Sequence, residues 1–148
     1  MRRGDDIWCQ GFSEPGAGSD LASLRCRAVQ DGGDFIVNGQ KVWNTLGHLA
    51  DYCELLVRTD PDVPKHQGIT CLLVDMHLPG ITVKPLTTLT GADEFAEIFF
   101  TDVRVPQAAL LGPINQGWQV AMTTLSNERA GGANLHLGVR KKIARLIQ

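Results

Sequence analysis

The residues best suited to do chemistry lie in a loop near the start of the chain. Residues 11–20 read GFSEPGAGSD and follow a short strand-like stretch. Glycine and proline favour a tight turn there, which leaves backbone N–H groups free to face a ligand. With the hydroxyls of Ser13 and Ser19, such a loop can hold an anion such as a pyrophosphate. Because it lacks the lysine of a P-loop and the spacing of a Rossmann fingerprint, an ordinary turn stays open as the alternative.

A carboxylate and a guanidinium form a second candidate site, at Glu128 and Arg129. On a helix, Glu128 lies three residues beyond Leu125 and seven beyond Ala121, so it extends an apolar face. We expect a carboxylate there to lose water, which raises its pKa toward that of a working general base. The alternatives are a surface glutamate in an ordinary helical turn and a solvated arginine.

Trp43 and Thr45 are a third candidate pair. They lie two residues apart, so on one strand they face the same side. Taken alone, Trp43 also fits a plain aromatic residue of a β core. Just before it, Asn38-Gly39 separates Phe35–Val37 from Gln40–Trp43, a pattern that predicts a β-hairpin with a type I′ turn.

The elements that must position these residues change in type along the chain. From Ile7 to about Val105, short apolar or alternating segments separated by turn residues predict seven or eight strands of a sandwich or barrel. The clearest are Tyr52–Arg58, Ile69–Met76, Ile81–Leu86 and Phe95–Phe100. After Pro113 the period becomes helical. We expect Asn115 to cap a helix that carries Trp118, Met122 and Leu125.

A second apolar stripe at helical spacing follows Gly131-Gly132, at Leu135, Val139, Ile143, Leu146 and Ile147. The two glycines either end the helix or make room for a close neighbour. A pair of helices cannot bury both stripes by itself, so we expect another subunit or further sequence to cover them.

Composition limits the class of protein. The chain has 148 residues, a net charge of −2, 43% apolar and 20% charged residues, which fits a globular domain and excludes a strongly basic nucleic-acid binder. The apolar runs are too short to span a membrane. The basic residues of the last twenty positions, without any acid among them, are interpreted as a solvated helix face. Cys9, Cys26, Cys53 and Cys71 have no metal-site spacing and favour buried, reduced thiols.

Five blocks, in order, resemble the acyl-CoA dehydrogenase family: GFSEPGAGSD, NGQKVWNT, FAEIFFTDVRVP, LLGPINQGW and LSNERA. The resemblance implies a mainly β chain, with the family's middle β-barrel domain at residues 1–112 and the truncated start of its helical C-terminal domain at 113–148. The family's N-terminal helical domain and most of its C-terminal bundle have no counterpart, which implies a fragment or truncated member. Phe12 departs from the family, where a smaller aliphatic residue is commoner.

The resemblance also assigns roles to residues. It implies that FAD is bound by Gln10, Phe12, Ser13, Ser19, Trp43 and Thr45, with Ser13 at the pyrimidine side, Trp43 beside the ring and Thr45 near N5. Ser19 would meet the FAD pyrophosphate or the substrate's pantetheine. The resemblance makes Glu128 the catalytic base, placed as in the isovaleryl and long-chain enzymes, and puts Arg129 near the substrate. Ser126 stands where several members have an acid that contacts the pantetheine.

The implied function is α,β-dehydrogenation of an acyl-CoA, with electrons passed to an electron-transferring flavoprotein by a homo-oligomer. The chain begins with charged residues rather than a hydrophobic leader, so we expect a cytoplasmic protein. Two rivals stay open. One is an acyl-CoA oxidase, which differs in the access of oxygen to reduced flavin. The other is a non-catalytic β-barrel and oligomerisation module without a complete flavin site. We expect weak or no turnover from this chain alone.

Overall fold

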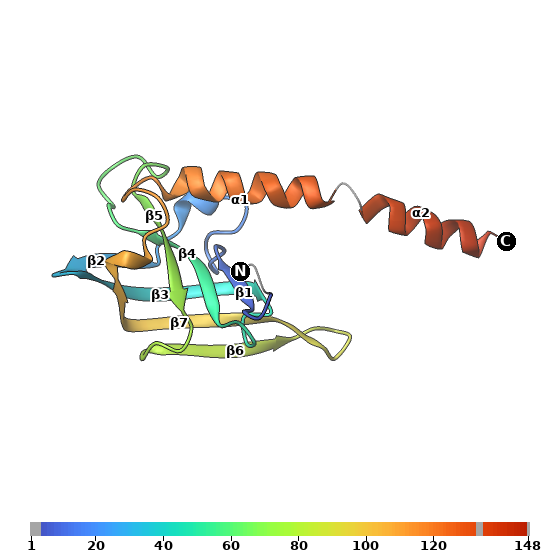
Figure 1. Cartoon of the computed structure of the whole chain (residues 1–148), viewed down its shortest axis with the longest axis horizontal. Coiled ribbons are helices and arrows are strands. Elements are labelled where there is room, and N and C mark those ends of the chain that lie inside the picture. The colour runs from blue at the N-terminus through green and yellow to red at the C-terminus, as the bar shows by residue number, and fades with distance from the viewer. Residues whose placement is uncertain (1–3, 133–134, 148) are drawn as a thin grey trace.

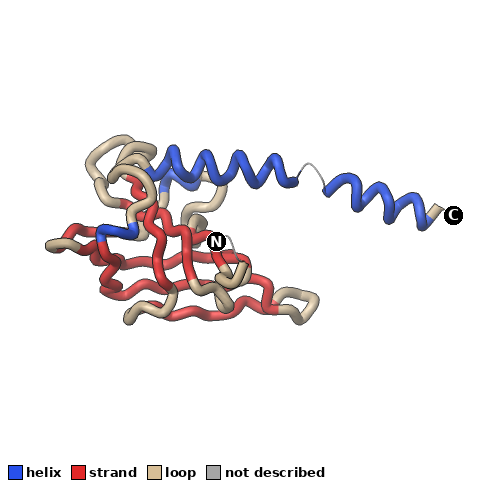
Figure 2. Tube along the Cα trace, viewed as in Figure 1, coloured by secondary structure: helices blue, strands red, loops and turns tan. Residues whose placement is uncertain are grey.

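A computed structural model describes residues 4–132 and 135–147 of the chain. One curled sheet of seven strands is followed by two helices (Figures 1 and 2). The strands are β1 Trp8–Gly11, β2 Arg27–Asp31, β3 Asp34–Thr45, β4 Tyr52–Arg58, β5 Ile69–Asp75, β6 Ile81–Thr87 and β7 Asp93–Pro106. The helices are α1 Gly117–Gly132 and α2 Leu135–Leu146, with short 3-10 turns at Leu21–Ser23 and Gln107–Ala109. The predicted mainly β fold with a helical C-terminal segment is confirmed, and its sheet is curled into a half-barrel.

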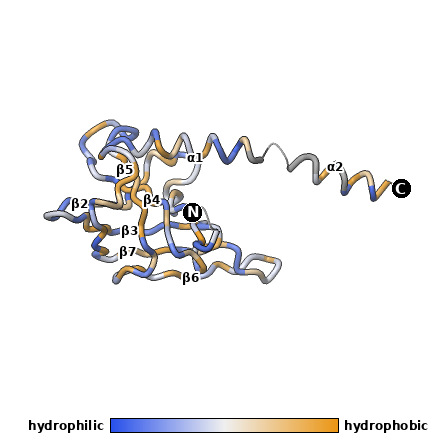
Figure 3. Tube along the Cα trace, in the orientation of Figure 1, coloured by the Kyte–Doolittle hydropathy of each residue, from blue (hydrophilic) through white to orange (hydrophobic). Residues whose placement is uncertain are grey.

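The sheet runs in the order β1-β4-β2-β3-β7-β6, and β5 pairs with the other edge of β4. β1 runs parallel to β4, whereas β3, β7 and β6 form antiparallel pairs. Apolar residues concentrate on β4 and β5 (Figure 3), both of which are almost entirely buried. This arrangement encloses one apolar core inside the curl, around Phe35, Leu55 and Ile98.

A second core joins the sheet to α1. Ala121 is fully buried against Leu56, Ile69 and Cys71, and Trp118, Met122 and Leu125 pack around them. The helix comes so close to β5 that a Cβ on Gly117 would lie 2.5 Å from the backbone nitrogen of Cys71. The first predicted helical stripe is therefore covered by the chain's own sheet.

The second helical stripe has no such cover among the described residues. α2 carries on beyond the sheet (Figure 1), and Val139, Ile143, Leu146 and Ile147 are each at least half exposed. The side chain of Leu135 lies outside the described residues. α1 ends at Gly132, so the glycine pair lies at the end of the helix. None of the described helices is long and apolar enough to cross a membrane.

The predicted hairpin at Asn38-Gly39 is wrong. β3 runs through this dipeptide without a break, and the tight turn lies instead at Gly32-Gly33, between β2 and β3. The Asn38 amide is used across the sheet, where it exchanges two hydrogen bonds of 2.9 Å with Asp102 of β7. Gly39 has φ +150 at a shift in register, and a Cβ there would lie 2.7 Å from the Cα of Cys26. Close packing, not a turn, therefore requires this glycine.

Asn115 does not cap the helix as predicted. It lies two residues before α1 with φ +63, and its backbone N–H donates to Thr70 Oγ1 at 2.9 Å. Its side-chain oxygen accepts a hydrogen bond from Thr59 Oγ1. Asn115 therefore ties the start of α1 to β5 and to the loop after β4, rather than satisfying the helix's own first N–H groups.

Candidate flavin and substrate site

A hollow of about 360 Å³ lies between the sheet and the outer part of α1. Its walls come from β1 and the loop after it, from the end of β3, and from α1. It is lined by Trp8, Cys9, Gln10, Phe12, Ser13, Val42, Trp43, Thr45, Leu46 and Glu128. Six residues singled out from the sequence thus meet in one hollow, although they come from three separate parts of the chain.

Trp43 reaches this hollow because β3 is irregular there. Trp43 has φ +62, and the register of β3 against β7 shifts between Lys41 and Asn44. The bulge leaves the Trp43 side chain 63% exposed, with its ring 6.0 Å from Phe95 in an edge-to-face contact. Thr45 is exposed and lines the same hollow, so the prediction that the two residues share a side is confirmed.

The predicted loop forms a tight turn directly after Ser13. Glu14 and Ala17 exchange two backbone hydrogen bonds of 3.0 Å, which close the turn over Pro15-Gly16. Gly11, at the end of β1, has no room for a side chain, since a Cβ would lie 2.7 Å from Cys53 Sγ. The space around Gly16 and Gly18 is open instead, so a ligand can approach their backbone closely.

Glu128 lines the hollow. The prediction that its carboxylate is shielded from water is wrong for the described chain. Ala121 is fully buried and Leu125 half-buried, whereas Ser126, Asn127 and Glu128 are exposed. The reason is that α1 extends past the last strand that could cover it (Figure 1). The described sheet therefore positions this carboxylate beside the hollow without burying it.

Ser19 and Arg129 are both exposed and are not among the residues that line this hollow. Ser19 lies beside Asp20, whose carboxylate accepts two hydrogen bonds from Lys65 Nζ at 2.7 and 2.8 Å. Those bonds, together with one from Ser23, hold the pKa of Asp20 below its ordinary value. Ser126 donates to the carbonyl of Met122 at 2.7 Å.

The residues that hold this loop in place could not be identified from the sequence. Arg58, nine-tenths buried, donates to three backbone carbonyls, those of Ala22, Leu24 and Lys65. It thereby links the segment after the loop to the connection between β4 and β5, and burial lowers the pKa of its guanidinium. Lys41 and Glu14 form a buried ion pair of 2.9 Å beneath the loop. Charged residues in a strand pattern are ordinarily assigned to the solvent face. The pattern therefore did not indicate that Arg58 and Lys41 are buried.

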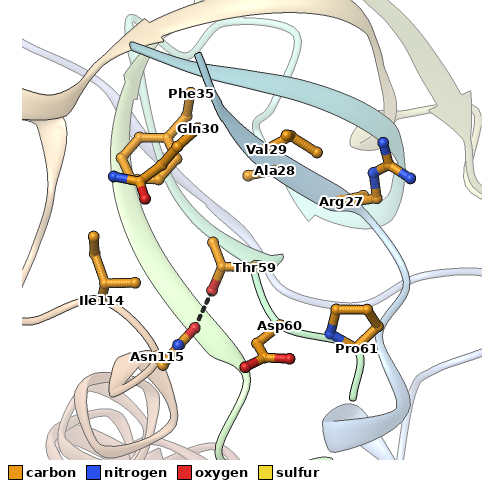
Figure 4. Close-up of a pocket in the computed structure, with 10 residues that line it drawn as sticks. All are labelled: Arg27, Ala28, Val29, Gln30, Phe35, Thr59, Asp60, Pro61, Ile114 and Asn115. Atoms are coloured by element: carbon orange, nitrogen blue, oxygen red, sulfur yellow. Dashed lines mark hydrogen bonds between the residues drawn. The ribbon is translucent and has the colours of Figure 1, made fainter. Parts of the chain in front are cut away.

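A second hollow, of about 370 Å³, lies between β2, the start of the loop after β4 and the segment before α1 (Figure 4). Arg27, Asp60 and Gln30 lie around it over a floor that includes Phe35, and Thr59 donates to Asn115 at one side. It contains none of the residues that the sequence singled out for chemistry.

Comparisons with known proteins agree on one family. The model of the acyl-CoA dehydrogenase middle domain matches residues 9–103. Acyl-CoA dehydrogenase FadE34 of Mycobacterium tuberculosis is 53% identical over 131 residues, which are 88% of this chain and 18% of that protein. An acyl-CoA dehydrogenase structure from Geobacillus kaustophilus superposes with a TM-score of 0.79 at 42% identity, over 82% of this chain and 33% of that one.

The ChsE4-ChsE5 complex of Mycobacterium tuberculosis contains a chain with a TM-score of 0.76 and 45% identity, over 82% of this chain and 31% of that one. Fold and sequence thus define a middle domain of the acyl-CoA dehydrogenase type. The chain belongs to the acyl-CoA dehydrogenase family. It spans 18% to 33% of the length of these relatives.

Proposed function

We propose that this chain carries the flavin-binding wall and the catalytic base of an FAD-dependent acyl-CoA dehydrogenase, as a fragment or truncated member of that family. The observation that carries the proposal is the hollow in which the predicted flavin-binding residues of the sheet meet Glu128 of α1. Removal of hydrogen from two adjacent carbons needs a hydride acceptor and a base at the same cavity, because both bonds break on one substrate.

The residues around the hollow suit a flavin. Trp43 offers a large flat surface, 63% exposed, that a planar ring can cover. The indole N–H of Trp8, which lines the same hollow, is buried without a partner among the described residues. A buried donor of that kind favours a ligand acceptor, because an unpaired polar group costs free energy.

We therefore assign the ring-binding wall of an FAD site to Gln10, Phe12, Ser13, Trp43 and Thr45. Ser19, at the exposed end of the loop, would bind the FAD pyrophosphate or the pantetheine of the substrate. When bound, FAD supplies a hydride acceptor for the β carbon.

Glu128 would take the proton from the carbon α to the thioester, and Arg129 would contact the substrate beside it. Glu128 is exposed in the chain by itself. Flavin and acyl-CoA filling the hollow would displace water from the carboxylate and place it against the substrate, where it can act as a general base. The surroundings that Glu128 needs as a base would thus form only when flavin and acyl-CoA are bound.

The enzyme would act in the cytoplasm as a homo-oligomer and pass electrons to an electron-transferring flavoprotein. The likeness to one chain of a two-protein complex supports assembly with further chains. Because the chain spans a third or less of its relatives, we expect weak or no turnover from it alone.

The visible spectrum of the purified chain with added FAD, before and after anaerobic addition of an acyl-CoA, tests the proposal. We expect bound flavin in the wild type and in Glu128→Gln, and bleaching only where Glu128 is intact. Asp62→Asn changes an exposed carboxylate in the loop between β4 and β5 that does not line the hollow; it is the matched control and should behave as the wild type. Flavin that binds but does not bleach would assign the chemistry to segments beyond this chain. Absence of flavin binding would overturn the proposal in favour of a non-catalytic module, and rapid reoxidation by oxygen would favour an oxidase.

A further inference from the structure

The wall of the hollow formed by residues 10–13 is held from behind by β3. Asn44 Nδ2 donates to the carbonyl of Gln10 at 2.6 Å, and the backbone N–H of Val42 donates to the carbonyl of Ser13 at 2.9 Å. Lys41 Nζ donates to the carbonyl of Phe12 at 3.0 Å. These three carbonyls are therefore all engaged by β3, although their residues line the hollow.

Lys41 differs from the other two donors because it also holds the next turn of the loop. Its ammonium is 3.0 Å from the Phe12 carbonyl and 2.9 Å from Glu14 Oε1. The side chain thus binds the residue before Ser13 and the residue after it. Ser13 is the residue assigned to the pyrimidine side of the flavin, and its position depends on both neighbours.

Glu14 extends the contact to a third segment. Its carboxylate accepts the backbone N–H groups of Arg25 at 2.7 Å and Cys26 at 2.8 Å, as well as the Lys41 ammonium. Both oxygens of the Glu14 carboxylate and the Lys41 ammonium thus have partners, and Lys41 is fully buried. A buried charge is costly unless it is paired and fully hydrogen-bonded. Replacing a buried ion pair by apolar residues of similar size often leaves the stability of a protein unchanged or raises it. Stability alone therefore does not account for an ammonium at this place.

We propose that Lys41 is a positioning residue for the flavin site: its buried ammonium clamps the loop on both sides of Ser13, so that the wall is formed before the ligand arrives. The assignment of the ligand as FAD rests on the proposed function, whereas the clamp itself concerns the free chain. Without the clamp, FAD binding has to order two or three loop residues, which costs conformational entropy. Part of that cost is recovered in contacts, so we expect FAD affinity to fall on the order of 10- to 100-fold.

Hydrogen exchange of the ligand-free chain tests the clamp independently of any flavin. In Lys41→Met we expect faster exchange at the amides of residues 12–18 and 25–26, with unchanged exchange in β7. Lys41→Arg keeps the cation and should restore most of the protection. Lys84→Met removes an exposed strand lysine on β6 that contacts Phe99 and is the matched control. If Lys41→Met fails to fold, the double variant Glu14→Gln/Lys41→Met takes its place. The double variant leaves no unpaired charge buried at this position.

FAD affinity of the same variants, measured by quenching of flavin fluorescence, gives the second readout. We expect weaker binding in Lys41→Met and partial recovery in Lys41→Arg. Equal exchange and equal affinity in Lys41→Met and the wild type would overturn the proposal. Faster hydrogen exchange spread evenly over the loop and β7 would also overturn it, because that pattern indicates a general loss of stability. If the wild type binds no FAD, the proposed function fails for this chain, and the exchange pattern still decides whether Lys41 positions the loop.

Discussion

Two buried thiols predict how the stability of this chain depends on alkaline pH. Burial raises the pKa of Cys26 to about 11 and that of Cys71 to about 12, from an ordinary value of 9.0. The folded state therefore keeps both protons to a higher pH than the unfolded state does. The stabilisation they contribute is complete below pH 9 and is lost as the pH rises above 9 toward the folded pKa values.

The expected size follows from that difference. Between pH 9 and about 11, each thiol lowers the free energy of unfolding by about 1.4 kcal/mol for each pH unit. From pH 8 to pH 10 the loss is about 1.3 kcal/mol for each thiol, or about 2.7 kcal/mol for both. At pH 10 this sum hardly depends on whether a folded pKa is 11 or 12, because both thiols are still protonated.

Urea unfolding of the chain at pH 8 and pH 10, under reducing conditions, measures this loss. The comparison is with the double variant Cys26→Ala/Cys71→Ala, because the Cys9 and Cys53 thiols are present in both proteins and their contribution cancels. We expect the wild type to lose about 2.7 kcal/mol more than the double variant over this range. The reasoning is refuted if both proteins lose the same free energy, or if the double variant loses more.

Three substitutions test other parts of the structure. Gly117→Ala should destabilise the chain by about 1–3 kcal/mol in urea unfolding, because its Cβ would meet the backbone of β5; an unchanged midpoint would contradict the close contact. Trp43→Ala should weaken FAD binding about tenfold and change stability by less than about 0.5 kcal/mol, since the side chain is largely exposed; a large loss of stability would assign it to the core. Arg58→Met should cost about 2–4 kcal/mol in chemical denaturation, because it leaves two buried carbonyls and one part-buried carbonyl without this donor, and a neutral result would exclude that role.

Several elements could be predicted from the sequence because their patterns are local. The apolar run Tyr52–Arg58 is β4 with the same bounds, and Leu24, Cys26 and Ala28 are buried while Arg25 and Arg27 are exposed, as their alternation predicts. All four cysteines are buried and free, as predicted. Period and composition depend on neighbouring residues only, so they need no knowledge of the fold.

The two errors in the fold have a common cause. Asn38-Gly39 is a strong local turn pattern and Asn115 a strong local cap pattern, yet each is used in a contact between distant segments. Asn38 pairs with Asp102, and Asn115 with Thr59 and Thr70. A local preference of about 1 kcal/mol is overridden when a long-range hydrogen bond and a packed backbone compete for the same residue.

The candidate site divides in the same way. Sequence blocks by themselves identified Ser13, Trp43 and Glu128, because they depend on residue types at fixed spacing. Only the tertiary structure gave the role of Lys41: a strict strand period puts Lys41 and Trp43 on the same side, whereas the bulge between them buries Lys41 and leaves Trp43 exposed. A bulge depends on how β3 pairs with β7 and how Lys41 reaches Glu14, 27 residues away. The sequence thus determined which groups are available for chemistry, and folding decided which of them face the hollow and which hold the wall behind it.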